Sequence, residues 1–114
     1  VMHSKYEELY NEAAEKVDEV AERILKLGSA PESRYSAYLQ TSEIKEAGVV
    51  SCAKEGIDLL LDSYKTLIAR ERKIIELASD AKDETTVSLI SDFLREQEKT
   101  GWMLVAVRSQ SCAE

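Results

Sequence analysis

The sequence predicts an all-α protein that forms a single domain over residues 1–114. At 114 residues the chain is long enough for one hydrophobic core and too short for two. Apolar residues make up 44% of it, with one proline and four glycines, so signals for the tight turns of a β protein are scarce. Long stretches also repeat apolar residues at the three- and four-residue spacing of amphipathic helices.

The first long helix is expected over residues 3–27. Leu9 and Val17 lie on its apolar stripe, and charged side chains occupy the other face. Gly28 follows as a C-terminal cap, and Pro31 prevents the helix from resuming. This stretch should therefore form one amphipathic helix with a definite end.

A connection of about twenty residues follows, with a short helix expected over 33–39 and Ser33 as its cap. A connection of this length can cross the end of a helical bundle. Two more long helices are expected over 51–81 and 83–108. Each long helix has an apolar arc wide enough for two neighbours, which indicates a bundle of more than three helices.

The net charge of −7 opposes binding to nucleic acid or to an anionic membrane, since such binding depends on clustered Lys and Arg. No apolar run approaches the roughly 20 residues that span a bilayer, and no leader pattern opens the chain, so a cytoplasmic location is expected. Cys52 and Cys112 lack metal-ligand spacing. They are expected to be free thiols in a reducing compartment.

Carboxylates are the candidate chemical groups, because the chain has only one histidine, His3. Asp18 and Glu22 lie one helical turn apart, outside the apolar arc of the first helix. Two acids at this spacing repel each other, and a cation bound between them would replace this repulsion with attraction. An ordinary solvated face, with Glu22 paired to Lys26, explains the same pattern, and the residues alone leave both interpretations open.

His3 limits how a metal site could be built. It precedes Asp18 by fifteen residues, which is about 22 Å along a helix, so the two side chains of one chain cannot bind the same ion. A site that uses both must lie between two chains. A twofold pairing of the same surface would bring His3 of one chain to Asp18 and Glu22 of the other, giving two sites per dimer.

Two further residues are weaker candidates. Glu71 falls on the apolar stripe of the second long helix, where it is either a metal ligand inside the bundle or, more in keeping with a buried acid, the partner of Arg95 or Arg108. Trp102 is expected to pack rather than to donate electrons.

Three stretches resemble the Dps-type miniferritins, which are DNA-binding proteins of starved cells. The stretch His3 to Gly28 is similar to their second helix, with these residues in register: His3, Leu9, Tyr10, Asp18, Ala21, Glu22, Arg23, Leu27 and Gly28. The crossover segment of that family is matched by Pro31, Tyr38, Ser42, Ile44, Lys45 and Glu46. Its last-helix signature is matched by Glu98, Lys99, Trp102 and Met103.

The resemblance implies a ferritin-like four-helix bundle with a long crossover that bears a short helix, the family's first helix being absent from this chain. It implies a hollow homododecamer that oxidises iron, often with hydrogen peroxide, stores Fe(III) and protects against oxidative stress. By the same resemblance His3, Asp18 and Glu22 are the catalytic and iron-binding residues of an inter-subunit ferroxidase centre. The Glu-x-x-His motif of classical ferritins is missing. The alternative is a structural bundle or a DNA-protecting cage without ferroxidase activity.

Three acids cluster where the second long helix passes into the third, at Asp80, Asp83 and Glu84. The resemblance implies that acids here line an ion-entry pore, since a ring of carboxylates concentrates cations. Capping of the last helix is an equal alternative.

The charge balance yields a prediction about DNA. At about physiological salt we expect no retardation of duplex DNA in a gel, because non-specific binding needs several phosphate contacts and the tail from residue 109 to 114 has no Lys or Arg. A tight complex that weakens steeply as salt rises would contradict this expectation.

Overall fold

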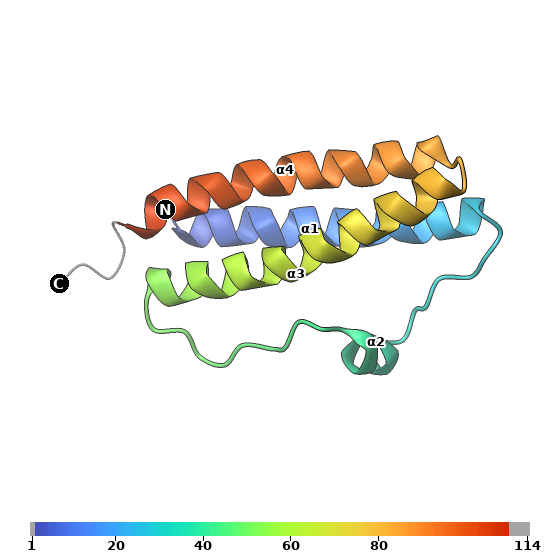
Figure 1. The fold of residues 1–114 in the computed structure, drawn as a ribbon. Helices are drawn as coiled ribbons and strands as arrows, with labels where there is room; N and C mark the ends of the chain where they lie inside the picture. The colour runs from blue at the N-terminus through green and yellow to red at the C-terminus, as the bar shows by residue number, and fades with distance from the viewer. Residues whose placement is uncertain (1, 110–114) are drawn as a thin grey trace. The chain divides into compact units, whose positions relative to one another are not determined.

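The computed structural model describes residues 2–109, and in that range it contains four helices and no strand. In chain order these are α1 (Met2–Lys26), α2 (Tyr35–Thr41), α3 (Ala53–Asp80) and α4 (Glu84–Arg108) (Figure 1). The all-α prediction is confirmed. The chain divides into two compact units, Val1–Ser42 with α1 and α2 and Glu43–Glu114 with α3 and α4.

In the first unit, α1 ends as the sequence predicts. Gly28 has a φ of +91°, a left-handed conformation that is strained for a residue with a side chain. The Ser29 amide then donates to the Ile24 carbonyl over 3.0 Å, and the Gly28 amide donates to that of Leu25 over 2.9 Å. These bonds satisfy carbonyls that the end of a helix leaves open.

The short helix α2 begins two residues later than expected, because Glu32 and not Ser33 organises its start. The Glu32 carboxylate accepts hydrogen bonds from the backbone amides of Ser33 and Arg34, each over 3.0 Å, and pairs with the Arg34 guanidinium. Arg34 is thereby held extended. These bonds, that from the Arg34 side chain first, lower the pKa of Glu32 to about 2.

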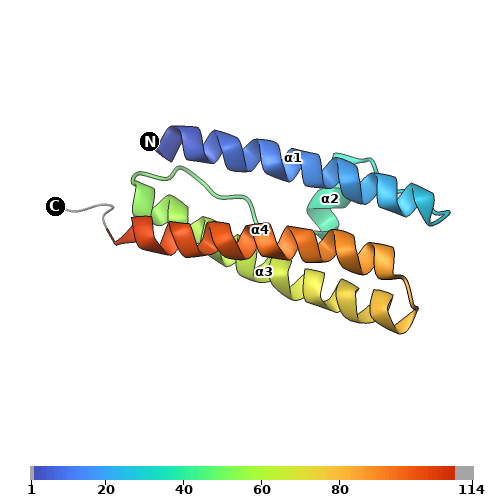
Figure 2. The ribbon, with the colours of Figure 1, turned by 90° about the horizontal axis from the view of Figure 1, so that it is seen from above.

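In the second unit, α3 and α4 lie side by side and antiparallel, as two views at right angles show (Figure 1, Figure 2). A tight turn joins them. Lys82 adopts a φ of 63° there, and the Asp83 amide donates to the Ala78 carbonyl over 2.8 Å. The turn is too short for any arrangement other than an antiparallel hairpin.

The buried positions of this hairpin repeat every seven residues. On α3 they include Ile57, Glu71 and Ala78, and on α4 the steps between buried residues are of three, four or seven, at Thr86, Ile90, Phe93, Gln97 and Leu104. This is the spacing of helices packed along a narrow seam. Glu71 and Gln97 are polar members of that seam, and they expose only 7% and 5% of their surfaces.

Ion pairs between residues far apart in sequence tie the second unit together. Arg108 near the end of α4 donates to the Asp58 carboxylate on α3, and Arg70 on α3 donates to Glu43 in the preceding connection. Each guanidinium lowers the pKa of the carboxyl that it contacts. Because these groups are largely exposed, we assign them a role in positioning the elements rather than a large stabilising energy.

Cys52, the residue before α3, is disulfide-bonded. The expectation of free thiols is therefore wrong for this residue, and Cys112 lies outside the described residues. Within residues 2–109, no helix combines the length and the apolar character needed to cross a membrane.

Gln97 provides a test of the seam. Its side-chain oxygen is buried and accepts no hydrogen bond from the described residues, an arrangement that costs about 1–3 kcal/mol. The change Gln97→Leu should therefore raise the free energy of unfolding by about 1 kcal/mol and the melting temperature by a few degrees.

Thermal unfolding followed by circular dichroism measures the effect. The matched control is Gln40→Leu, because Gln40 is exposed on α2 and its replacement should change stability by less than about 0.5 kcal/mol. A lower melting temperature for Gln97→Leu would show that the amide makes an essential interaction.

Candidate metal centre

Helix α1 carries all three candidate ligands, His3, Asp18 and Glu22, and all three are exposed. Asp18 and Glu22 project from successive turns, about 6 Å apart along the axis, so their carboxylates border one patch of surface. This part of the chain is helical because its apolar residues recur at helical spacing. The regular helix fixes the spacing of the two acids.

Neither acid is bound by a neighbouring side chain. Within residues 2–109 the Asp18 and Glu22 carboxylates make no hydrogen bond or ion pair, and the Glu22–Lys26 pair of the solvated-face alternative does not form. Their oxygens are thus open to a ligand. Two adjacent carboxylates offer hard oxygen donors, which suit Fe(II) and other hard divalent cations.

His3 lies almost two-thirds of the length of α1 away from these acids. The helix is continuous from Met2 to Lys26, so the separation of about 22 Å between His3 and Asp18 is fixed by the helical rise. Correspondingly, the described residues contain no group of three or more His, Cys, Asp or Glu side chains placed to hold a metal ion. One chain thus provides an acidic half and an imidazole half that do not meet.

The acidic cluster at the α3–α4 turn has a capping role. Asp83 is the N-cap of α4, and its carboxylate accepts from the backbone amide of Thr86 over 3.1 Å and from the Thr86 hydroxyl. Asp80, the last residue of α3, and Glu84, the first of α4, are exposed. The capping alternative is therefore realised at Asp83, and Asp80 and Glu84 remain the candidates for an ion-entry surface.

Glu71 is buried as expected, and the two arginines expected near it make ion pairs with other acids. Arg95 pairs with Asp92 one turn earlier on its own helix, and Arg108 pairs with Asp58. Sequence reasoning also missed the buried Gln97 on the facing helix. The available signal was an amide on the seam of α4, between Phe93 and Leu104.

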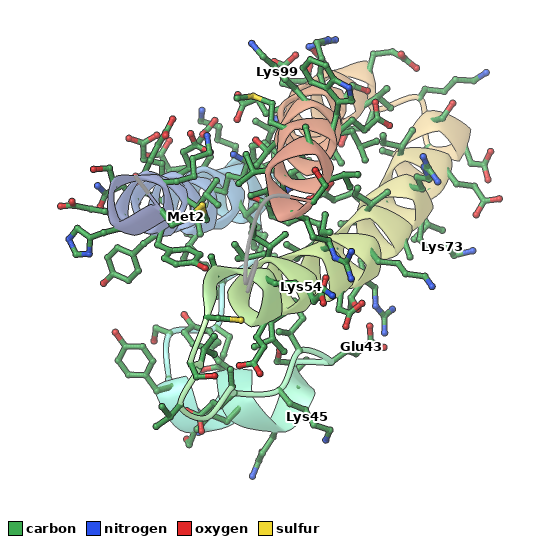
Figure 3. The ribbon with its side chains drawn as sticks, turned by 90° about the vertical axis from the view of Figure 1, so that its left-hand side faces the viewer. Met2, Glu43, Lys45, Lys54, Lys73 and Lys99 are labelled. Atoms are coloured by element: carbon green, nitrogen blue, oxygen red, sulfur yellow. The ribbon has the colours of Figure 1, made fainter. Side chains whose placement is uncertain are left out.

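Trp102 exposes 71% of its surface on α4, so the expectation that it packs is wrong within this chain. Lys73 on α3 and Lys99 on α4 extend to different sides of the hairpin (Figure 3). These two lysines therefore do not share one patch of the surface, as clustered phosphate contacts would need.

Comparison with known proteins gives consistent matches. A family model described as a ferritin-like domain matches residues 1–110. A DNA protection during starvation protein of Porphyromonas gingivalis is 47% identical over 106 residues, which are 93% of this chain and 67% of that protein. DNA protection during starvation protein 2 of Bacillus anthracis is 37% identical over 109 residues, covering 96% of this chain and 75% of that protein.

Solved structures agree with these sequence matches. The crystal structure of a Dps protein from Vibrio cholerae, described as a ferritin-like diiron-carboxylate protein, superimposes with a TM-score of 0.88 at 42% identity. The match covers 91% of this chain and 65% of that one, so this chain spans about two thirds of the length of such relatives. Dps from Staphylococcus aureus gives the same TM-score at 32% identity and covers 93% of this chain and 71% of that one.

The capping role and the ion-entry role of Asp83 predict different effects of its substitution on the free energy of unfolding. Asp83→Ala removes the acceptor for the Thr86 amide, so the free energy of unfolding should fall by about 1 kcal/mol. Asp80→Ala is the matched control, because Asp80 is exposed and its loss should cost less than about 0.5 kcal/mol. Urea unfolding measures both. If Asp83→Ala and Asp80→Ala were equally stable, Asp83 would not stabilise α4 as its cap.

Proposed function

This chain belongs to the ferritin-like family, among the relatives of the DNA protection during starvation proteins, and from that membership we propose that it binds and oxidises Fe(II). The proposed centre is shared between two copies of the chain. Asp18 and Glu22 of one copy bind the iron together with His3 of the other. The resemblance to Dps-type miniferritins seen in the sequence is confirmed at the level of the family.

The observation that carries this proposal is the exposed, unbound pair of carboxylates on α1. Acids on a helix face can pair with a basic side chain one turn away, whereas Asp18 and Glu22 have no such partner among the described residues. Bound Fe(II) would relieve the repulsion between them. The pair therefore fits a cation that arrives as substrate.

The distance between His3 and Asp18 supports a centre that is completed by a second copy of the chain. An isologous interface repeats each contact, so a dimer in which His3 approaches the acids of its partner contains two equivalent centres. Imidazole and carboxylate together are common ligands of iron. His3 should also orient the ion, because a single imidazole fixes one coordination direction.

The reaction balances with hydrogen peroxide as the oxidant. Two Fe(II) ions each give up one electron, the O–O bond breaks, and two protons are taken up to form two water molecules and two Fe(III). The carboxylates favour the product, since hard anionic oxygens bind Fe(III) more strongly than Fe(II). Iron is thus substrate and cargo, and we propose that Fe(III) is stored as mineral inside a closed homododecamer, which limits oxidative damage.

We propose that two acids at the α3–α4 turn guide the entry of iron ions. Asp80 and Glu84, exposed beside the α3–α4 turn, would draw cations toward the assembly electrostatically. A cytoplasmic location stays a prediction. The names of the relatives refer to DNA protection, but the net charge of −7 favours iron chemistry without DNA binding in this chain.

Substitution of the acids tests the centre. The double variant Asp18→Ala, Glu22→Ala should keep its fold and its metal-free melting temperature or gain slightly, because both side chains are exposed and their repulsion disappears. Its rate of iron oxidation with hydrogen peroxide, followed by absorbance of Fe(III), should fall at least about tenfold. His3→Ala should lower the rate as well.

Helix α1 offers a matched control in Glu15 and Glu19, two exposed acids with the same four-residue spacing. Glu15→Ala with Glu19→Ala should oxidise iron at the parental rate. After subunit exchange, a mixture of the His3 variant and the Asp18, Glu22 variant should recover part of the activity, since mixed dimers contain one complete centre. If the Asp18, Glu22 double variant were as active as the parent, these acids would be ordinary solvated side chains and not iron ligands.

A further inference from the structure

The open end of the α3–α4 hairpin carries a sulfur group that the proposed iron chemistry does not use. Cys52, the residue before α3, is partly buried and disulfide-bonded. The chain has one other cysteine, Cys112, which lies four residues beyond the end of α4 at Arg108 and outside the described residues. Within a single chain, the count of cysteines therefore leaves Cys112 as the partner of Cys52.

The register of the hairpin puts the two cysteines within reach of each other. Arg108 donates to the Asp58 carboxylate over 2.5 Å, and the start of α3 and the end of α4 lie at the same end of the hairpin (Figure 1, Figure 2). Cys52 precedes Asp58 by six residues, which is about 9 Å along the helix. The four residues from Arg108 to Cys112 can span up to about 14 Å. The chain after α4 is thus long enough to reach the start of α3.

This end of the hairpin is packed without help from a disulfide. Ile57 and Leu104 expose 0% and 1% of their surfaces, and the Asp58–Arg108 pair lies beside them in the sequence. Disulfides that a fold depends on are typical of small domains with many cysteines and little core, whereas this chain has two cysteines and a buried seam. A bond at this place suits a reversible modification.

We propose that Cys52 and Cys112 are a peroxide-reactive thiol pair, whose reversible disulfide fastens the end of the chain to the start of α3. In the reduced chain, Cys52 lies at the amino end of α3, where the partial positive charge of the backbone amides stabilises a thiolate. Hydrogen peroxide is also the oxidant proposed for iron, so thiols and iron would meet the same reagent. The thiol reaction itself uses no iron.

The reaction balances in two steps. The Cys52 thiolate attacks one oxygen of hydrogen peroxide, the O–O bond breaks, and the departing hydroxide takes up a proton to form water, which leaves a sulfenic acid on Cys52. The Cys112 thiolate then attacks the Cys52 sulfur, the S–S bond forms, the S–O bond breaks, and a second water is released. The two thiols lose two electrons, which the peroxide gains, and a thiol reductant reverses the bond.

Thiol counting and intact mass test the bond. The protein is reduced, freed of reductant and treated with hydrogen peroxide in the presence of a metal chelator. We expect both thiols to disappear, the mass of the chain to fall by about 2 Da, and dithiothreitol to restore both thiols. A dimer linked through Cys52 on non-reducing electrophoresis, or a gain of about 32 Da from sulfinic acid in place of the disulfide, would overturn the proposal.

The variant Cys112→Ser separates the two steps. Peroxide should convert Cys52 of this variant to a sulfenic acid, a gain of about 16 Da that dimedone captures. Cys52→Ser is a poorer choice, because serine is a favourable helix cap and would itself stabilise α3. The matched control is Ser111→Ala, which changes the adjacent residue, keeps both thiols and should form the disulfide as the parent does. Resistance of Cys52 to peroxide in Cys112→Ser would overturn the proposal.

Thermal unfolding tests the fastening. The oxidised parent should melt at least about 5 °C above the reduced parent, because a cross-link between residues about 60 apart restricts the unfolded chain. Cys112→Ser should melt at the same temperature with and without dithiothreitol. Equal melting temperatures of the oxidised and reduced parent would overturn the proposal.

Iron oxidation distinguishes a failure of this proposal from a failure of the proposed function. Cys112→Ser should oxidise iron at the parental rate, because neither cysteine is among the proposed iron ligands. If the disulfide forms and the Asp18, Glu22 variant still oxidises iron at the parental rate, the thiol pair stands and the iron centre is wrong. If that variant loses iron oxidation and peroxide forms no disulfide, the iron centre stands and the thiol pair is wrong.

Discussion

The rigid rise of helix α1 is the constraint on which the functional interpretation depends. A continuous helix from Met2 to Lys26 advances about 1.5 Å per residue, so the imidazole of His3 and the carboxylates of Asp18 and Glu22 are held apart by a fixed length. No side-chain rotation can close that separation. A centre that uses all three must therefore be completed by a second chain, and exposure of the three side chains is what such an arrangement requires.

In the second unit, contacts at both ends of the hairpin align α3 with α4. The Asp83 cap and the left-handed Lys82 set the turn, and the Asp58–Arg108 pair aligns the other end of the two helices. Between these points lies the seam with Glu71 and Gln97. Polar groups in a seam lower stability but disfavour other registers, in which they would lie against apolar side chains.

The helical content and the end of α1 could be predicted from the sequence because both follow from local patterns, namely apolar spacing and a glycine at the C-terminal cap. The separation of His3 from the acids was predictable for the same reason. The start of α2 was not, since Ser33, the expected cap, lies before the helix, where its amide and that of Arg34 donate to the Glu32 carboxylate. The partners of Arg95 and Arg108 and the bonding of Cys52 depend on three-dimensional proximity, which spacing in one chain does not encode.

The division of the proposed centre between chains makes protein concentration a condition for chemistry. An isolated chain would present only half-sites, so the number of complete centres would grow with the square of concentration while dimers are scarce. Newly made chains would be nearly inert toward Fe(II). Oxidation would begin only after chains pair, and Fe(III) would then form where an assembly is present to enclose it.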